Sequence, residues 1–557
     1  MNTTWRITRL FGSLGLALLL VLSVDTWLGC LPEASTKEPP TSRPTPITPQ
    51  DGWWRDAVFY QIFLRSFKDS NGDGIGDFEG LIRQLDYLND GKPETTDDLG
   101  VTAIWLLPVF SSPSYHGYDT TDYRQINKPY GNNETFARFV QEAHKRGIKV
   151  VLDLVINHTS SQHPWFLASQ DPTSAYRPWY VWRSDNPGWT QPWGSGSVWH
   201  PSGGAYYYGI FWKGMPDLNF QHEPVRKEIT SLAQHWIKAG VDGYRLDAAR
   251  YIIANGAGQL QSDQPETLDY WRSFRNDVKQ TRNDAVLIGE VWSDTASIEK
   301  YCKGDQLDLA FHFPMAEAIY LAVTAMSNEA LWKTIQQSQH YPISCWAPFL
   351  TNHDQIRIMS RLRQDLPMMR NAAKILLTLP GTPFVYYGEE VGMLNGNNRN
   401  DEAKRTPFAW NASPNGGFTT GTPWEPLTPH DTANVTSQSK DPLSLLSLYR
   451  KLIHLRNQQP ALRRGDIRKI DIVGTPQEEI FAALRSYNNE RIAVILNLSD
   501  KSIEKLSLSL STTTHQILFS EGNPELLTPS TQPTTQPSTS ALLSLKLPAN
   551  AALILKL

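Results

Sequence analysis

The sequence contains little cysteine and no excess of charge of either sign. Only 3 of its 557 residues are cysteines, and none lies in a C-x-x-C or Cys/His zinc spacing, which excludes a disulfide scaffold and a zinc module. The 52 basic and 56 acidic side chains give a formal net charge of −4 without a basic block, so we expect no nucleic-acid partner. With 40% apolar residues, the chain has the composition of a folded protein.

Aromatic side chains, by contrast, are plentiful. The 19 tryptophans and 21 tyrosines gather in glycine-rich stretches such as residues 179–212. Such rings offer large, flat contact surfaces. They suit stacking on flat, hydroxylated ligands.

The first 50 residues have the pattern of an export signal followed by a tether. An apolar run over residues 10–24 follows two arginines and precedes a small-residue segment that ends at Cys30, as in a signal peptide. A membrane span needs roughly 20 apolar residues, so this run is too short. We predict a signal peptide over residues 1–29 that resembles a bacterial lipoprotein signal, with Cys30 lipidated, and a Pro/Thr-rich linker over residues 30–50.

This N-terminus predicts an exported protein. We expect it on the cell surface or in the periplasm as a membrane-anchored lipoprotein, or secreted, with membrane contact only through the lipid on Cys30. An ordinary cleaved signal or an uncleaved anchor is the alternative. The pairing of the other two cysteines, Cys302 and Cys345, stays open. Two isolated thiols are more often unpaired small apolar side chains, but the sequence does not decide between the two states.

Strand-like apolar runs alternate with helical patterns through most of the chain. Helical segments such as residues 133–146 and 226–239 separate them. Buried parallel strands read as continuous apolar stretches, so the pattern predicts an α/β fold, a (β/α)₈ TIM barrel over residues 51–465. Periodicity alone leaves a doubly wound sheet open. The eight runs are residues 57–63, 101–107, 149–154, 241–246, 286–289, 307–313, 346–350 and 383–387.

Two further parts interrupt or follow this alternation. A long aromatic and polar stretch predicts an inserted subdomain after strand 3, at about residues 159–223. From residue 466 to 557, short strand-like runs separated by turn residues predict a C-terminal antiparallel β-sandwich domain. Within it, the Thr/Pro-rich residues 528–540 are expected to form a surface loop.

Acidic residues follow four of the predicted strands. Asp153 ends the third run, Asp247 follows the fourth, Glu290 the fifth and Asp354 the seventh. Barrel enzymes place catalytic groups at the C-terminal ends of their strands. We therefore predict that these four carboxylates converge on one pocket.

The segments around these residues resemble the four signature regions of the α-amylase family, glycoside hydrolase family 13. The resemblance covers nearly everything after residue 53. It implies Asp247 as the nucleophile, Glu290 as the general acid/base and Asp354 as the carboxylate that stabilises the transition state, while Asp153 holds its neighbours. The four segments are Asp153-Leu-Val-Ile-Asn157-His158, Gly243-Tyr-Arg245-Leu-Asp247, Gly289-Glu290-Val-Trp292 and Phe349-Leu-Thr-Asn352-His353-Asp354.

The chemistry of a retaining glycosidase agrees with these roles. One ionised carboxylate attacks the sugar while a protonated carboxyl donates to the leaving oxygen, with the two roughly 5–5.5 Å apart. Arg245, two residues before Asp247 on the same strand face, is expected to keep the nucleophile ionised. The resemblance further implies a substrate-binding set that comprises Tyr118, His158, Arg245, His353 and Arg405.

A loop after the first predicted strand alternates oxygen side chains with glycines, in Asp69-Ser-Asn71-Gly-Asp73-Gly-Ile75-Gly-Asp77. A hard cation such as Ca²⁺ requires this kind of ligand. The loop resembles the start of an EF-hand but lacks the acidic residue at its twelfth position. The same stretch binds calcium in the oligo-1,6-glucosidase branch of the family, so the resemblance implies Ca²⁺ ligands at Asp69, Asn71, Asp73, Ile75 and Asp77. A solvated acidic turn is the alternative.

Many amylases have another calcium site, at positions that match Asn157, Asp217 and the carbonyl of Tyr251. Many family members carry His at the position of Tyr251, so the sequence leaves open whether this protein binds a second calcium ion.

The specificity motifs look intermediate between oligo-1,6-glucosidases and neopullulanases. Met215-Pro-Asp-Leu-Asn219 resembles the neopullulanase side, and Arg405-Thr-Pro-Phe-Ala-Trp410 the glucosidase side. Tyr115 stands where exo-acting glucosidases carry the Asp that grips the terminal sugar. The resemblance therefore implies an endo-acting α-amylase on α-1,4 bonds in starch and maltooligosaccharides.

Other functions on the same scaffold stay open. These are an α-glucosidase, a cyclomaltodextrinase or neopullulanase, or a glucosyltransferase, because water and sugar hydroxyls compete for the same glycosyl-enzyme. A non-catalytic glucan-binding surface lipoprotein is a further alternative, which the intact trio of catalytic carboxylates disfavours. We expect a monomer.

Overall fold

The computed structural model describes residues 52–474, 477–510, 512, 514–527 and 541–557. The predicted signal peptide, the linker with its predicted lipidation site Cys30, and the whole Thr/Pro-rich loop over residues 528–540 lie outside these residues. Within the described ranges, no helix is both long and apolar enough to cross a membrane.

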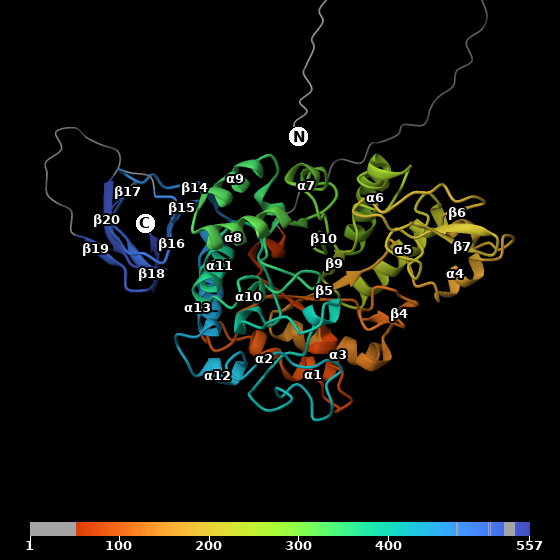
Figure 1. Ribbon diagram of the computed structural model, residues 1–557, viewed down its shortest axis with the longest axis horizontal. Coiled ribbons are helices and arrows are strands. Elements are labelled where there is room, and N and C mark those ends of the chain that lie inside the picture. The colour runs from red at the N-terminus through yellow and green to blue at the C-terminus, as the bar shows by residue number, and fades with distance from the viewer. Residues whose placement is uncertain (1–51, 475–476, 511, 513, 528–540) are drawn as a thin grey trace, which may run out of the picture. The chain divides into compact units, whose positions relative to one another are not determined.

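Eight parallel strands form a closed barrel, of which β5, β9 and β10 are labelled in Figure 1. Hydrogen-bonded neighbours run in the order β12-β11-β10-β9-β5-β2-β1-β13. The barrel closes where Phe384 N donates to Pro348 O at 2.9 Å. Each strand lies inside one of the eight apolar runs, which confirms the predicted fold class. The strands are β1 (Phe59–Ile62), β2 (Ala103–Leu106), β5 (Lys149–Leu154), β9 (Gly243–Leu246), β10 (Val286–Gly289), β11 (Leu309–Phe311), β12 (Trp346–Ala347) and β13 (Phe384–Tyr386).

Helices follow the strands and cover the barrel. In α3, the Asn132 side chain accepts from Thr135 N at the first turn, and one face buries Phe136, Phe139 and Val140. A polar cap and an apolar face at helical spacing together specify such a helix. The helices of the barrel region are α1 (Phe78–Arg83), α2 (Leu85–Leu88), α3 (Asn133–Lys145), α5 (Glu223–Lys238), α6 (Pro265–Thr281), α7 (Thr295–Tyr301), α8 (Phe313–Ala325), α9 (Glu329–Gln337), α10 (Ile358–Arg361), α11 (Leu366–Thr378), α12 (Val435–Ser439), α13 (Leu445–Gln458) and α14 (Pro460–Arg464).

Side chains fill the barrel interior. The rings of Phe59 and Phe384 stack with centroids 4.4 Å apart, and Trp105 packs against Phe311 at 5.1 Å. A packed interior leaves the chemistry to the rim at the C-terminal ends of the strands.

The inserted subdomain lies between β5 and α5. It contains α4 (Pro164–Ser169) and a three-stranded sheet of β6 (Trp182–Arg183), β8 (Ala205–Tyr208) and β7 (Trp199–Ser202). A short hairpin of β3 (Phe110–Ser111) and β4 (Asp122–Ile126) precedes it, after β2. Figure 1 shows the subdomain strands in yellow at one side of the barrel.

The C-terminal region forms two antiparallel sheets around a core of their own. One sheet has the order β14-β15-β16-β21-β18 and the other β17-β20-β19, and side chains of both enclose Ile495, Leu508 and Leu545. Lys374 of α11 donates to Glu521 of β18 at 2.7 Å and fixes this region to the barrel. The strands are β14 (Asp466–Lys469), β15 (Ile480–Tyr487), β16 (Glu490–Asn497), β17 (Ile503–Leu510), β18 (Gln516–Glu521), β19 (Glu525–Leu527), β20 (Ala541–Leu547) and β21 (Ala552–Lys556).

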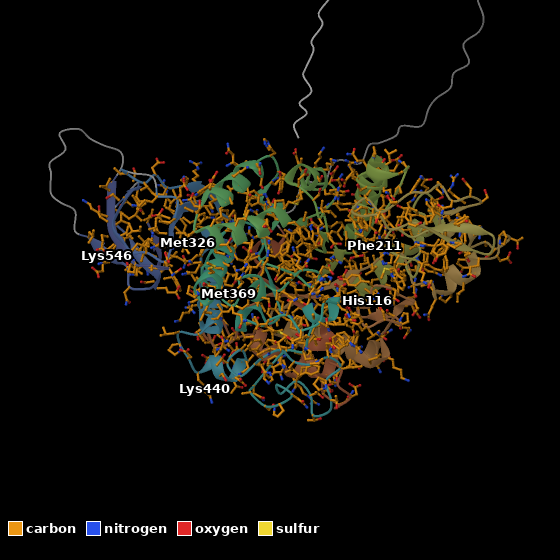
Figure 2. The ribbon with its side chains drawn as sticks, viewed as in Figure 1. His116, Phe211, Met326, Met369, Lys440 and Lys546 are labelled. Atoms are coloured by element: carbon orange, nitrogen blue, oxygen red, sulfur yellow. A yellow bond between two sulfur atoms is a disulfide. The ribbon has the colours of Figure 1, made fainter. Side chains whose placement is uncertain are left out.

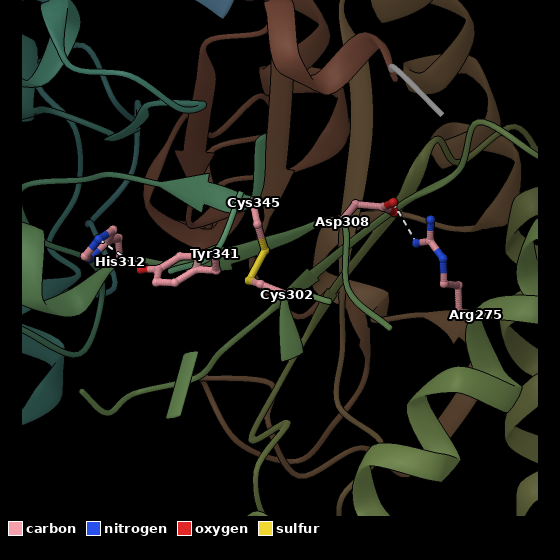
Figure 3. Close-up of a disulfide and its surroundings, with 6 residues drawn as sticks. All are labelled: Arg275, Cys302, Asp308, His312, Tyr341 and Cys345. Atoms are coloured by element: carbon pink, nitrogen blue, oxygen red, sulfur yellow. Dashed lines mark hydrogen bonds and ion pairs between the residues drawn. A yellow bond between two sulfur atoms is a disulfide. The ribbon is translucent and has the colours of Figure 1, made fainter. Parts of the chain in front are cut away.

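The structure settles the state of Cys302 and Cys345, which the sequence left open. The two form a disulfide with a Cα–Cα separation of 5.9 Å (Figure 3). It ties the end of α7 to the residue before β12, and the pairing of β11 with β10 and β12 brings these segments together. The positions of the two cysteines in the sequence do not indicate that they are close in space. Closing a loop of 43 residues reduces the entropy of the unfolded chain, worth about 4 kcal/mol in the chain-entropy account.

Candidate active site

A buried arginine joins three carboxylates at the rim of the barrel. Arg245 Nη1 donates to Asp247 Oδ1 at 2.6 Å and to Asp153 Oδ1 at 2.9 Å. Its Nη2 forms an ion pair with Glu290 Oε1 at 2.9 Å. Burial opposes its charge, but the carboxylates raise the pKa of Arg245 well above its ordinary value. The strand register explains the meeting, because Asp153 on β5 pairs directly with Arg245 on β9.

The candidate nucleophile Asp247 and the candidate acid Glu290 follow two adjacent strands, β9 and β10. Glu290 N donates to Leu246 O at 3.1 Å, so Glu290 lies beside the end of β9. Its Oε2 accepts from Ala248 N at 2.9 Å. Ala248, directly after Asp247, has φ +49°, a left-handed conformation that costs energy for a non-glycine residue and is typical of functional sites.

The electrostatic environment separates the protonation states of Glu290 and Asp354. Burial and the negative charges of Asp247 and Asp354 raise the pKa of Glu290 to about 8, against the opposing effect of Arg245. Burial also raises the pKa of Asp354, but its interactions with His353 and Arg405 lower it below the ordinary value. At neutral pH, Glu290 therefore holds a proton that it can donate while Asp354 is ionised.

Asp354 is held from both sides. Arg405 Nη2 donates to its Oδ1 and His353 Nε2 lies near its Oδ2, each at 3.0 Å. Burial lowers the pKa of His353 well below its ordinary value, so the ring is neutral. Gln61 Nε2 donates to His353 Nδ1 at 2.8 Å, which leaves the proton on Nε2, facing Asp354.

Tyr118 connects the two halves of the site. Its hydroxyl donates to Asp153 Oδ2 at 3.0 Å and lies 2.6 Å from His353 Nε2, and its ring stacks on His353 at 5.5 Å. Gly117, at φ +80°, permits the turn before it. His158 joins this group through its Nε2, 3.1 Å from the carbonyl oxygen of Tyr118.

All eight predicted catalytic and substrate-binding residues thus belong to one connected network, together with Asp153. Sequence reasoning missed Gln61, a buried polar residue on β1 that orients His353. The signal was present, because a single amide within an apolar strand needs a partner inside the protein.

The five predicted calcium ligands form a separate loop. Asp69 Oδ1 accepts from Asn71 N and Gly72 N, both at 2.8 Å. Asp77 Oδ1 accepts from Gly80 N at 2.7 Å and caps α1. Among the described residues, no group of three or more His, Cys, Asp or Glu side chains is arranged to hold a metal ion.

The sequence left open whether a second calcium binds, and two groups of that possible site are hydrogen-bonded to each other. Asn157 Nδ2 donates to the carbonyl oxygen of Tyr251 at 2.7 Å. Burial raises the pKa of Asp217 well above its ordinary value, although bonds from Ile210 N and Asn157 oppose this shift.

Comparison with known proteins assigns the family. The α-amylase catalytic domain family matches residues 61–465. The chain belongs to the α-amylase family. It is 37% identical over 454 residues to alpha-amylase 3 of Dictyoglomus thermophilum, with 80% of this chain and 85% of that one covered. It is 33% identical over 533 residues to an oligo-1,6-glucosidase of Heyndrickxia coagulans, with 81% and 93% covered.

Solved structures of the α-amylase family share the fold. An alpha-amylase from H. orenii superposes with a TM-score of 0.79 at 39% identity and covers 90% of this chain and 99% of its own. A trehalulose synthase from Pseudomonas mesoacidophila gives a TM-score of 0.77 at 29% identity, with 91% and 100% covered. The protein is therefore a glycosidase of the α-amylase type, and its similarity to both amylases and oligo-1,6-glucosidases agrees with an intermediate branch.

Proposed function

We propose that the protein is a retaining, endo-acting α-amylase that hydrolyses α-1,4-glucosidic bonds in starch and maltooligosaccharides. In this proposal Asp247 attacks the anomeric carbon while Glu290 protonates the departing glycosidic oxygen. Glu290 then removes a proton from water, which releases the sugar from Asp247. Asp354, held by Arg405 and His353, stabilises the positive charge that develops on the sugar.

The spacing of the carboxylates supports retention. Asp247 and Glu290 bind different nitrogens of the single Arg245 guanidinium, at 2.6 and 2.9 Å. An inverting enzyme keeps its carboxyl groups roughly 6.5–9.5 Å apart so that water fits between them. Two carboxylates on one guanidinium favour the closer, retaining arrangement.

The environment of Tyr115 carries the endo-acting part of the proposal. Arg405 Nη1, from the side chain that binds Asp354, reaches the Tyr115 hydroxyl at 3.5 Å. The Tyr115 ring stacks on Trp424 with centroids 5.4 Å apart. An aromatic pair, rather than a carboxylate that grips a chain end, therefore lies next to the sugar-binding carboxylate. Such rings suit continuous contact with a longer chain.

A product time course tests this proposal. Reducing-end-labelled maltoheptaose and soluble starch are incubated with the full chain, and product lengths and anomeric configuration are resolved. We expect mixed short oligomers in the α configuration from the earliest time points. Glucose alone from the chain end would assign an α-glucosidase, and products longer than the substrate a glucosyltransferase. Bound glucan without turnover would instead assign a binding protein.

We also propose that the loop over residues 69–77 binds Ca²⁺. Carboxylate oxygens of Asp69, Asp73 and Asp77, the amide oxygen of Asn71 and the carbonyl oxygen of Ile75 are ligands that this ion prefers. Segment 418–424 fastens the loop, since Asp69 N donates to Phe418 O and Trp424 N to Gly74 O, both at 3.0 Å. A bound cation here would stabilise the contact of two chain segments far apart in sequence.

Calcium removal is expected to lower the melting temperature by about 5 °C, because a ligand bound only by the folded state stabilises it. The measurement is thermal unfolding in chelator and in millimolar CaCl₂. Asp73→Asn should abolish the difference, because it removes a carboxylate ligand from the loop. The bonds that Asp73 accepts come from Asn71 and Ile75 of the same loop. Asp122→Asn is the control, because Asp122 accepts a similar bond from Arg124 N outside the loop. An equal calcium shift in all three proteins would exclude this loop as the site.

We propose further that the protein is exported and acts outside the cytoplasm, as its N-terminal sequence predicts. The Cys302–Cys345 disulfide supports this location, because disulfides persist mainly in oxidising compartments. Metabolic labelling with a palmitate analogue, with Cys30→Ser as the control, tests the lipid anchor.

A further inference from the structure

Three aromatic side chains extend from the candidate active site over the inserted subdomain. Phe211 packs against His158 with ring centroids 5.3 Å apart. Trp193 lies 5.4 Å from Phe211 and 5.3 Å from Tyr251, again between centroids. Trp193 is 49% exposed. We call Trp193, Phe211 and Tyr251 the aromatic platform (Phe211 is labelled in Figure 2).

Hydrogen bonds hold the exposed member of the platform in place. Gln191 Nε2 donates to the carbonyl oxygens of Phe211 at 2.7 Å and Ile210 at 3.2 Å. A turn over the next residues is closed by Gly194 N donating to Gln191 O at 3.2 Å. An exposed tryptophan on a loop fixed in this way loses little further conformational freedom when it binds a ligand.

The platform lies on the Glu290 side of the site. Tyr251 N donates to Ala248 O at 2.9 Å, and Ala248 N in turn donates to Glu290 Oε2 at 2.9 Å, so Tyr251 is near the acid. Arg250 Nη1 also donates to the carbonyl oxygen of Trp292, two residues after Glu290, at 2.9 Å. The Tyr115 and Trp424 pair, by contrast, adjoins Arg405, which holds Asp354.

A general acid marks the leaving-group side of a glycosidase, because it protonates the oxygen that departs. Sugars on that side belong to the reducing-end portion of the glucan. We expect the apolar faces of these sugar rings to stack on the exposed face of Trp193 at the edge of the site.

We propose that the aromatic platform binds the glucose units on the reducing-end side of the cleaved bond, with Trp193 as a specificity-determining residue and Gln191 as its positioning residue. This inference rests on the proposed function. It predicts that the platform contributes to catalysis only for substrates whose leaving group is itself a sugar chain.

The test compares two donors with different leaving groups. Maltoheptaose places glucose units on the platform, whereas α-maltosyl fluoride loses only fluoride. We measure kcat/KM for both and take their ratio. In Trp193→Ala the ratio of maltoheptaose to fluoride should fall about three- to tenfold, the value of one aromatic stacking contact. Trp193→Phe, which keeps a flat ring, should recover part of it, and Gln191→Ala should show part of the loss.

Trp212 offers a matched control in the same segment. It is 46% exposed, its ring lies against Gly214, and no ring contact joins it to the platform among the described residues. Trp212→Ala should leave the ratio unchanged. An equal fall in Trp212→Ala, or an unchanged ratio in Trp193→Ala, would overturn the platform assignment.

The two donors also separate this inference from the proposed function. If wild-type protein hydrolyses neither donor, the glycosidase proposal fails. If it hydrolyses both and Trp193→Ala matches it on both, only the platform fails.

Discussion

Replacing Asp247 by asparagine is expected to lower turnover of starch and maltoheptaose by about 10⁴-fold or more, the scale of removing a catalytic nucleophile. The amide has the size of the carboxylate but cannot form the covalent bond to the anomeric carbon. Because Arg245 also contacts Asp153 and Glu290, the surrounding network keeps two of the three contacts between Arg245 and a carboxyl group. Glucan binding should therefore survive while kcat is lost.

Binding and turnover are measured on the same preparation, by isothermal titration with maltoheptaose and by reducing-sugar release. Asp269→Asn makes the same chemical change on the exposed face of α6, where Asp269 pairs with Arg272, and should match the wild type. Turnover of Asp247→Asn within tenfold of that control would remove Asp247 from the nucleophile's role.

Replacing Glu290 by glutamine is expected to lower kcat/KM for maltoheptaose by about 10²–10⁴-fold, the usual contribution of a general acid. For α-maltosyl fluoride the loss should be much smaller, because fluoride departs without a proton. kcat/KM is the informative quantity, since it covers the first chemical step and excludes the later attack of water. Equal losses on both donors would contradict the role of Glu290 as the acid.

The pH profile gives an independent readout of the same residue. Glu290 has a raised pKa of about 8, so it is protonated below that pH and loses its proton above it. Wild-type kcat/KM on maltoheptaose should therefore decline above about pH 8. In Glu290→Gln this alkaline limb should be absent, because the amide does not titrate in that range. Persistence of the limb in the variant would assign it to another group.

Much of the fold could be read from the sequence because burial dictates composition. A parallel barrel strand is covered on both faces, so each of the eight strands leaves an apolar run such as residues 149–154. The carboxylates could be placed for the same reason. Because the barrel strands are parallel, their C-terminal ends all lie at the same rim. Asp247 and Glu290 follow directly after β9 and β10 and therefore lie at that rim.

The electrostatics of the site depend on neighbours that no local pattern reveals. Arg245 was expected to contact Asp247, two residues along its own strand, but its contact with Glu290 arises from a neighbouring strand. The bond from Gln61 to His353 joins the first strand to the end of the seventh. Arg245 could be named from the sequence and Gln61 was missed, and the protonation states that result from their contacts could not be predicted.

The sequence by itself thus determined the barrel, the chemical types gathered at its rim and the family, because strand burial and short motifs are local properties of the chain. Only the tertiary structure decided that Cys302 and Cys345 form a disulfide, that one guanidinium holds three carboxylates, and that Phe211 packs against His158 while Trp193 packs against Phe211 and Tyr251. Each of these depends on distances between segments far apart in the sequence, and those distances are set by how strands and loops pack together.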